Sequence, residues 1–446
     1  MSPRAYCVVG GGISGLTAAY RLRAAAGADA TITVFDPGDR LGGILRTEVV
    51  GGQPMDVGAE AFVLRRPEVP ALLAELGLVE SQRATTGVRP LIYSGQQLHA
   101  LPSGTVMGIP TSASSLAGLV DDATIARIEG EPGRPFSWRP GSDPAVAELV
   151  ADRFGEQTVA RSVDPLLCGV YAGSAATIGL RAAAPTVAAA LDHGAASLTD
   201  AVRHGLPAVG DGPVFGALDG GYRVLVDELV ARSRAQWVRA TVTQLEPGWA
   251  VCDDSGGRWP ADAVILAIPA PRLGPLVDEI APRSAAAARR ITSASSAVVA
   301  LAVPLDIPFP RCSGVLVASG ERLRSKAITL SSRKWGPRGD TQLLRLSFGR
   351  FGDDLAERAS DEELLAWSLD DLATVFGLAV HPIDFRVQRW IEAMPQYGPG
   401  HADLAAEVRA GLPAGLAVAG SYLDGIGVPA CVAAADRAVT GIIEAL

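Results

Sequence analysis

Lysine is almost missing from this 446-residue chain, since Lys326 and Lys334 are the only two and arginine supplies nearly every positive charge. Acidic side chains outnumber basic ones by 48 to 39, which gives a formal net charge of −9. A protein of that charge is a poor candidate for nucleic-acid binding, because the phosphate backbone attracts basic surfaces. The excess of arginine over lysine is typical of a GC-rich genome, and it therefore indicates no particular function by itself.

Cysteine and long apolar runs are also scarce. The five cysteines lie far apart, none of them in a C-x-x-C pair, so the sequence argues against a disulfide framework and predicts no bound metal. No stretch of about 18 uncharged apolar residues is present that would cross a membrane. The N-terminal apolar stretch is broken by glycines and followed by Arg21 and Arg23, unlike a signal peptide. We therefore expect a cytoplasmic protein, with peripheral contact at a membrane surface left open.

The composition predicts a folded protein of more than one unit. Hydrophobic residues make up 48% of the chain and charged residues 20%, which is enough apolar material for large cores. Glycine and proline are frequent, at 50 and 31 residues, but they follow no period, so collagen and low-complexity linkers are excluded. At about 150 residues per domain, the length predicts two or three structural units.

The first residues carry a dinucleotide-binding pattern. An apolar run over residues 5–9 predicts a buried strand, and residues 10–15 spell G-G-G-I-S-G. Residues 16–26 predict a helix, and residues 31–35 predict a second strand that ends at Asp36. A glycine motif between a strand and a helix, with an acid about 20 residues on, is the context that a nucleotide-binding βαβ unit requires.

Each residue of this motif has a physical task. Gly10 permits the tight turn, Gly12 lets the backbone approach a pyrophosphate, and Gly15 lets the helix pack on the strand. The helix N-terminus offers free N–H groups and a positive dipole to phosphates, and Asp36 can accept hydrogen bonds from ribose hydroxyls. The motif alone does not distinguish FAD from NAD.

A second glycine element favours FAD. Residues 39–47, D-R-L-G-G-I-L-R-T, place Gly42 and Gly43 between Arg40 and Arg46. This stretch resembles the R-x-x-G-G-x-x-x-[ST] element that follows the first βαβ unit in many flavoproteins. A surface turn is an equally good interpretation of the stretch by itself, but its place directly after the second strand favours the flavin interpretation.

The rest of the chain alternates between helical and β-rich regions. Residues 67–80 predict a helix, residues 88–103 a hairpin that turns at Ser94-Gly95, residues 110–205 a mainly helical region with a loop near 130–144, and residues 206–216 a Gly/Pro linker. Further along, residues 237–245 and 263–268 predict strands, residues 361–376 a helix with acids in its first turn, and residues 416–420 a buried strand before a final helix.

The order of these elements resembles the flavin monoamine oxidase superfamily and, within it, the oxygen-dependent protoporphyrinogen and coproporphyrinogen III oxidases. The resemblance covers most of the chain. Besides the glycine elements it rests on D-V-G-A-E-A-F at 56–62, D-P-L-L-C-G-V-Y-A-G at 164–173, Lys334-Trp335 with L-L-R at 343–345 as a β segment, R-W-I-E-A-M-P-Q-Y at 389–397 and G-S-Y-L-D-G-I-G-V-P at 420–429. The stretch at 389–397 is the most specific to the porphyrinogen oxidases.

The resemblance implies an α/β fold with three parts. It implies an FAD-binding Rossmann-like domain assembled from separated segments, with a β-rich substrate domain and an inserted helical domain. The expected boundaries are 1–80, 217–272 and 386–446 for the FAD-binding domain, 81–109 and 273–385 for the substrate-binding domain, and 110–216 for the helical domain.

The resemblance also assigns the candidate site, with FAD as the cofactor. Cofactor binding is implied for Gly10, Gly11, Gly12, Ile13, Ser14, Gly15, Asp36, Arg40, Gly42, Gly43, Gly58, Ala59, Glu60, Ala61, Val242, Trp390, Ile426, Gly427 and Val428. Substrate binding is implied for Arg66, Gly169, Tyr171 and Gly173. Arg66 would bind a propionate, although a solvated pair with Arg65 is an equal alternative, and Tyr171 is as well explained as a core aromatic. No residue stands out as the catalytic acid or base.

Two departures from the family pattern affect this assignment. Ile44 replaces the Lys or Arg that is common after the double glycine, so Arg40 or Arg46 would have to supply that charge. Ser174 stands where the family often has Asp. Neither change removes a group that the family's chemistry requires.

The implied reaction is dehydrogenation of a porphyrinogen, with hydride passing to flavin N5 and molecular oxygen reoxidising the flavin to yield hydrogen peroxide. The resemblance favours coproporphyrinogen III, with four propionates, over protoporphyrinogen IX, with two, and implies haem biosynthesis with a ferrochelatase downstream. An amine oxidase, a carotenoid desaturase and a flavin-binding scaffold without turnover are the alternatives. Amine oxidases generally need a lysine near flavin N5, and a desaturase would not predict the 389–397 stretch.

Overall fold

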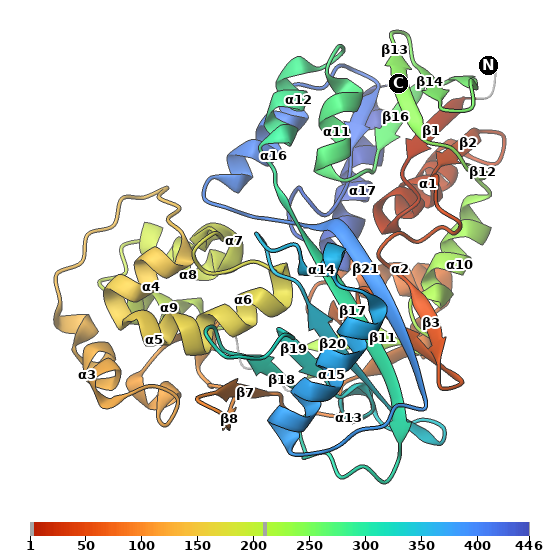
Figure 1. Ribbon diagram of the computed structural model, residues 1–446. Helices are drawn as coiled ribbons and strands as arrows, with labels where there is room; N and C mark the ends of the chain where they lie inside the picture. The colour runs from red at the N-terminus through yellow and green to blue at the C-terminus, as the bar shows by residue number, and fades with distance from the viewer. Residues whose placement is uncertain (1–3, 208–211, 446) are drawn as a thin grey trace.

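The computed structural model describes residues 4–207 and 212–445 and has a mixed α/β architecture. A parallel sheet with helices on its faces lies at the upper right of Figure 1, a second and larger sheet lies at the lower centre, and a lobe of short helices lies at the left. The N- and C-termini both lie beside the parallel sheet (Figure 1).

The parallel sheet has five strands in the order β12-β2-β1-β16-β22, and every neighbouring pair is parallel. The strands are β1 Ala5–Val9, β2 Thr31–Phe35, β12 Gln236–Val238, β16 Ala263–Leu266 and β22 Leu416–Val418. They are drawn from three distant parts of the chain, residues 5–35, 236–266 and 416–418, as expected for a Rossmann-like unit assembled from separated segments. Their apolar sequences follow from burial on both faces, because helices cover a parallel sheet on either side.

Helices α1 Ile13–Ala26, α10 Arg223–Ser233 and α17 Val428–Ala445 pack together beside this sheet. Helices α11 Ala270–Val277, α12 Pro282–Arg289 and α16 His401–Ala410 form a second group (Figure 1). A shared apolar core joins the strands to both groups.

The larger sheet has seven strands in the order β21-β17-β20-β19-β18-β7-β8 and is antiparallel except between β18 and β7. Its strands are β7 Leu91–Ser94, β8 Gln97–Ala100, β17 Ser293–Pro304, β18 Gly314–Val317, β19 Ala327–Thr329, β20 Thr341–Phe348 and β21 Asp384–Pro395. The hairpin β7–β8 confirms the predicted turn after Ser94.

Helix α15, Asp361–Phe376, belongs to the core on one side of this sheet and confirms the predicted helix. It begins with a capping box in which the Ser360 hydroxyl accepts from the Glu363 amide and the Glu363 carboxylate accepts from the Ser360 amide. Alternate side chains of β20 join the same core, so the side chains between them, Arg345 among them, face the opposite side of the sheet.

The helical lobe contains α3 Asp122–Gly130, α4 Val146–Phe154, α5 Glu156–Thr158, α6 Asp164–Tyr171, α7 Leu180–Ala183, α8 Pro185–Asp192 and α9 Leu198–Gly205. A buried ion pair lies inside it, with Arg153 Nε donating to Glu131 Oε1 at 2.9 Å. The same carboxylate accepts from the amides of Leu198 and Thr199, and so satisfies the N-terminus of α9. The predicted helical region and its loop before α4 are both confirmed.

Smaller elements connect these parts. They include the hairpin β3 Thr47–Val50 and β4 Gln53–Asp56, the strands β5 Phe62–Val63, β6 Gln82–Ala84, β9 Thr105–Val106, β10 Ile109–Pro110 and β11 Phe215–Leu218, the sheet β13 Val242–Glu246, β14 Ala250–Asp253 and β15 Arg258–Pro260, and the helices α2 Glu68–Leu76, α13 Ser331–Trp335 and α14 Leu355–Arg358. Helix α2 confirms the helix that the sequence predicted there.

Two predicted strands need correction. The predicted strand 237–245 is two strands, β12 and β13, which belong to different sheets because the Ala240 amide turns back to the Val238 carbonyl. Lys334-Trp335 lies in helix α13 and not in a β segment, since the amides of Arg333 and Lys334 both donate to the carbonyl of Leu330 and close a helical turn.

Two boundaries predicted from the sequence fall inside observed strands. Part of the linker predicted at 206–216 is strand β11, which begins at Phe215, while residues 208–211 lie outside the described residues. Strand β21 pairs with β17 along most of its length and crosses the predicted domain boundary at residue 386. The three-domain division stays a prediction, and we propose that its last boundary follows Pro395.

Candidate functional site

The glycine loop between β1 and α1 is shaped by backbone contacts. Gly10 has φ +106° and its amide donates to the carbonyl of Phe35 at 2.8 Å, which brings the loop against the end of β2. A Cβ on Gly15 would lie 1.8 Å from the Gly10 carbonyl oxygen, so only glycine allows the helix to approach the strand this closely. No side chain of the described residues caps the N-terminus of α1 at Gly12, and its first N–H groups can therefore receive a phosphate.

The double-glycine element docks directly on this loop. The Gly42 amide donates to the Gly11 carbonyl at 2.7 Å, and Gly42 forms a parallel bridge with Gly12. Arg40 folds the element by donating to the carbonyls of Gly43 at 2.6 Å and Leu45 at 2.9 Å. The two glycine motifs, predicted separately, therefore form one surface, and Arg40 shapes its backbone.

Asp36 follows β2, and its carboxylate is oriented by two amides. Oδ2 accepts from Gly11 N at 2.7 Å, and Oδ1 accepts from Gly38 N at 2.9 Å. A carboxylate has about four acceptor positions, so capacity remains for the two hydroxyls of a ribose.

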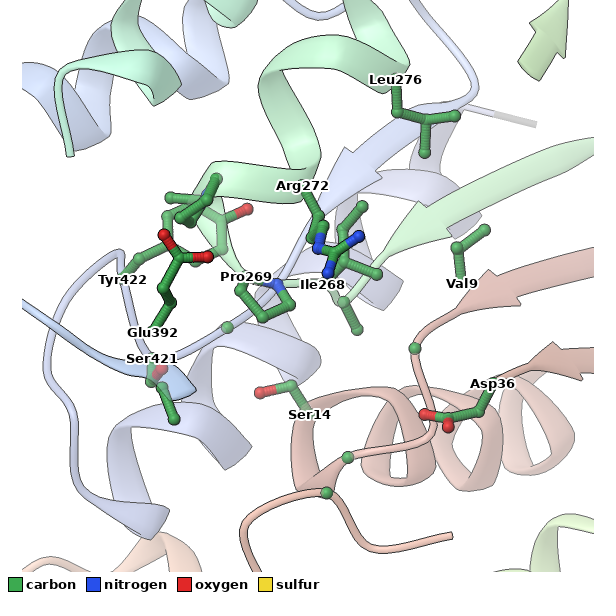
Figure 2. A pocket seen from close by; sticks show the side chains of 18 of the residues that line it. Val9, Ser14, Asp36, Ile268, Pro269, Arg272, Leu276, Glu392, Ser421 and Tyr422 are labelled. Atoms are coloured by element: carbon green, nitrogen blue, oxygen red, sulfur yellow. The ribbon is translucent and has the colours of Figure 1, made fainter. Parts of the chain in front are cut away.

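A cavity of about 820 Å³ opens beside these elements. Figure 2 shows Ser14 and Asp36 on one side of it, Ile268, Pro269 and Arg272 on another, and Glu392 with Ser421 at the far end. The predicted cofactor residues that line it are Gly10, Gly12, Ile13, Ser14, Asp36, Gly43 and Val242. A long cavity with a glycine loop, an uncapped helix N-terminus and an acid for the ribose fits the parts of FAD.

The other predicted cofactor residues lie outside this lining. Some of them contact residues of the lining and hold its backbone in place, namely Gly11, Gly15, Arg40 and Gly42. Residues 426–428 lead into α17, whose Cys431 lines the cavity, and their role at the flavin stays a prediction.

Residues 56–60, which we call the 56–60 segment, are held by the larger sheet. Arg345 Nη1 donates to the carbonyls of Asp56 and Gly58, both at 3.1 Å, and Trp390 Nε1 donates to the carbonyl of Val57 at 2.9 Å. Further along, Lys334 Nζ donates to Glu60 Oε2 at 2.7 Å. The predicted roles of Gly58, Ala59, Glu60, Ala61 and Trp390 at the isoalloxazine stay predictions.

The pKa values of the two acids of the 56–60 segment are shifted in opposite directions. Burial raises the pKa of Asp56 to about 7, against the hydrogen bonds from the Thr47 hydroxyl and the Tyr222 amide that lower it. Burial also tends to raise the pKa of Glu60, but the charges of Lys334 and Arg345 outweigh it and leave that pKa at about 2. Glu60 is therefore a fixed charge, while Asp56 titrates near neutral pH.

Sequence reasoning missed two charged residues of the cavity. Arg272, in the first turn of α11, projects into it in Figure 2, and its cation suits a diphosphate. The available signal was its place shortly after a predicted strand, at the edge of a parallel sheet where ligands bind. Glu392 lies at a bulge where β21 loses register with β17, with φ +48°. No local sequence pattern indicates this bulge.

The predicted substrate residues lie in different surroundings. Gly169 is exposed, whereas Tyr171 is buried and its hydroxyl donates to the Ala182 carbonyl at 3.1 Å. A Cβ on Gly173 would lie 2.3 Å from Gln396 Oε1, so this glycine is needed for packing. Arg66 is paired with Glu68 near the start of α2. Their predicted contacts with substrate stay predictions.

Within residues 4–207 and 212–445, every helix is too short or carries too much polarity to cross a membrane. The five cysteines are free, and four of them are buried. Burial raises the pKa of Cys7 to about 12, so this thiol stays protonated, as its place in an apolar strand predicted.

Comparison with known proteins places these features in a family. The model of the flavin containing amine oxidoreductase family matches residues 13–443. The coproporphyrinogen III oxidase of Mycobacterium tuberculosis is 75% identical over 446 residues, covering 100% of this chain and 99% of that protein. The enzyme of the same name from Bacillus subtilis is 27% identical over 471 residues, covering 98% and 97%.

A solved structure agrees with the fold. The crystal structure of a candidate protoporphyrinogen oxidase from Exiguobacterium sp. 255-15 superimposes with a TM-score of 0.88 at 29% identity, covering 100% of this chain and 99% of that one. The glycine surface, the cavity and these matches lead to one conclusion. The chain belongs to the family of flavin-containing amine oxidoreductases, and it is an oxidoreductase with FAD as its cofactor.

Proposed function

We propose that this protein is an FAD-dependent oxidase that converts coproporphyrinogen III to coproporphyrin III, with molecular oxygen as electron acceptor and hydrogen peroxide as second product. The observation that carries the proposal is the identity of three quarters, over the whole chain, with a relative named for that substrate. The enzyme would act in haem biosynthesis, in the cytoplasm or at a membrane surface, and a ferrochelatase downstream would take its product.

The cofactor supplies the redox chemistry: each round removes a hydride and a proton from the macrocycle, and oxygen with the two electrons and two protons gives hydrogen peroxide. The chain itself binds and orients. The glycine surface and Arg272 hold the diphosphate, Asp36 holds the ribose, and the 56–60 segment supports the cavity wall from the side of the larger sheet. Glu392 is the carboxylate that we propose as proton acceptor, because it lines the cavity in Figure 2.

The lysines argue against amine oxidation. Lys326 is buried and donates to the Gly349 carbonyl at 2.6 Å, and Lys334 is bonded to Glu60. Neither is among the residues that line the cavity, within the described part of the chain. The lining therefore offers no lysine of the kind that amine oxidases generally need, and Lys334 is held by its ion pair with Glu60.

The test is aerobic oxidation of freshly reduced coproporphyrinogen III by the purified, FAD-loaded protein, followed by porphyrin fluorescence and by peroxide yield. We expect turnover well above the rate without enzyme and one peroxide for each two-electron step. A Glu392→Gln variant with intact FAD content is expected to lose about a hundred- to ten-thousand-fold in kcat if the carboxylate accepts the proton.

Protoporphyrinogen IX is the matched comparison substrate. Faster oxidation of this two-propionate compound would replace the proposal with its main alternative, protoporphyrinogen oxidation. Oxidation of neither compound by protein with a normal flavin spectrum would favour a flavin scaffold or an amine oxidase, and a panel of primary amines would separate those two.

A further inference from the structure

Three successive carbonyls of the 56–60 segment accept hydrogen bonds from two side chains of the seven-stranded sheet. Arg345, on β20, donates to the first and third, and Trp390, on β21, donates to the second. These strands flank β17 on either side, so the donors come from both sides of one central strand. A backbone stretch held at three successive carbonyls has little freedom to move relative to that sheet.

The other edge of the segment is bonded to the wall of the FAD cavity. The Val57 amide donates to the Arg46 carbonyl at 2.9 Å, and the Ala59 amide donates to the Ile44 carbonyl at 3.2 Å. Ile44 itself lines the cavity. The segment therefore forms a bridge, with the sheet on one side and a wall of the cofactor cavity on the other.

Close packing at Gly58 makes this bridge rigid. A Cβ there would lie 1.8 Å from the Ile44 carbonyl oxygen and 2.9 Å from Trp390 Cζ2. No side chain larger than hydrogen fits between the cavity wall and the indole. A displacement of Trp390 or Arg345 is consequently transmitted to Ile44 and is not absorbed by loose packing.

Arg345 also brings a positive charge to this segment, and among the described residues its hydrogen bonds go to carbonyls and not to an acid. Glu60, whose pKa the Arg345 charge helps to lower, is itself bonded to Lys334 and Ser331. The guanidinium is half-buried, so its field is only partly screened by water. A positive charge near the cavity wall favours the more negative, reduced form of a bound flavin.

We propose that Arg345 and Trp390 are positioning residues for the cofactor, which hold the 56–60 segment and Ile44 in place from the seven-stranded sheet, and that the Arg345 charge raises the reduction potential of the bound FAD. The inference rests on the flavin chemistry of the proposed function and not on its substrate. According to this inference, the seven-stranded sheet positions the cofactor in addition to any contact it makes with the substrate.

The test compares four variants after reconstitution of the apoprotein with FAD: Arg345→Gln, Arg345→Lys, Trp390→Phe and, as matched control, Arg386→Gln. Arg386 lies on β21 and is exposed, with hydrogen bonds to Asp384 and the Phe385 carbonyl. The measurements are the FAD dissociation constant from flavin fluorescence, the flavin absorption spectrum and the reduction potential, none of which needs a porphyrinogen.

Arg345→Gln is expected to weaken FAD binding at least about tenfold, to shift the absorption band and to lower the potential. Arg345→Lys keeps the positive charge but cannot donate to both carbonyls in the same geometry. We therefore expect the reduction potential of the flavin to change less than the FAD dissociation constant. Trp390→Phe is expected to weaken binding about threefold, and Arg386→Gln to stay within about twofold of the wild type. With coproporphyrinogen III, kcat should fall in Arg345→Gln while KM changes little.

The proposal is overturned if folded Arg345→Gln matches Arg386→Gln in affinity, spectrum and potential. If Arg345→Gln does not fold, the other two variants decide: wild-type affinity and spectrum in both Arg345→Lys and Trp390→Phe would equally overturn it. Loss of activity with unchanged flavin properties would place Arg345 at the substrate instead.

Discussion

The glycine loop at residues 10–15 shapes one part of the cofactor cavity with backbone alone, whereas the 56–60 segment depends on side chains that follow it by about 290 to 330 residues. In the loop, Gly15 is required by the Gly10 carbonyl five residues before it, and Gly10 by the carbonyl of Ala267, which a Cβ would approach to 2.3 Å. In the segment, the same rigidity comes from Arg345 and Trp390, whose place is fixed only when the larger sheet forms. The glycine loop is therefore fixed by backbone contacts, and the 56–60 segment by side chains that only the assembled larger sheet brings into place.

Substitutions at Gly15 and Gly12 should disrupt the glycine loop in two different ways. They carry the largest expected effects on folding and on FAD binding. Gly15→Ala places a Cβ 1.8 Å from the Gly10 carbonyl, so we expect a misfolded protein or one without FAD. Gly12→Ala meets nothing nearer than Gly43 Cα at 3.9 Å, so the apoprotein should fold normally. It should bind FAD at least about tenfold more weakly, because the Cβ occupies the approach of the pyrophosphate.

Thermal unfolding of the apoproteins and flavin fluorescence titration would measure both effects. An unchanged FAD affinity in Gly12→Ala would contradict the assignment of the glycine loop to the diphosphate. A stable, FAD-loaded Gly15→Ala would contradict the close approach of α1 to β1.

Glu131→Gln sharpens the comparison, because it breaks a tertiary side-chain network remote from the cofactor. Glu131 and Arg153 are both buried, and loss of one partner leaves the other charge unpaired, at a cost of about 3–5 kcal/mol of unfolding free energy. FAD affinity should not change. Burial tends to raise the pKa of Glu131, but hydrogen bonds from Thr199, Leu198 and Arg153 outweigh it and lower that pKa.

This lowered pKa sets the pH dependence. The stabilisation by Glu131 is present above its unfolded pKa of about 4.5 and is lost as the pH falls through the lower folded value. Urea unfolding of wild type and variant between pH 7 and pH 3 would measure it. Curves that stay equally far apart over that range would contradict the depressed pKa.

Asp56→Asn tests the titrating acid of the 56–60 segment. The folded pKa of about 7 exceeds the unfolded value, so the wild type should lose stability as pH rises from about 4 to 7, relative to a variant that cannot ionise. The difference between the two proteins should change by up to about 4 kcal/mol, since ~1.4 kcal/mol accompanies each pH unit in that window. Urea unfolding at pH 5 and pH 7.5 gives the comparison, and a constant difference would show that Asp56 is ionised throughout.

The smallest effect is expected at the exposed pair Arg66–Glu68. Glu68→Gln should change the unfolding free energy by less than about 1 kcal/mol, because exposed ion pairs contribute little. Arg66→Gln should be equally stable, and a several-fold rise in KM for coproporphyrinogen III would support its predicted contact with a propionate. An unchanged KM would leave Arg66 with its surface role only.

The features that could be predicted from the sequence are those set by short motifs, and the features that could not are those set by contacts between distant strands. The strand–glycine–helix unit, Asp36, the helix at 361–376 and the family were within reach, because each depends on a local pattern or on short motifs. The break at Ala240, the helix at Lys334 and the bulge at Glu392 were not, since each depends on which sheet a neighbouring strand joins. The hydrogen bonds of Arg345 were also beyond reach, because L-L-R at 343–345 does not reveal which backbone that arginine meets.

The most direct test of the account is reduction of the bound flavin by the substrate without oxygen. The purified protein would be mixed anaerobically with coproporphyrinogen III while the flavin and porphyrin absorbances are recorded, and air would then be admitted. We predict that the oxidised flavin band disappears as porphyrin absorbance rises, and that air restores it. A flavin that stays oxidised under these conditions would contradict the assignment of FAD as the acceptor of electrons from the porphyrinogen.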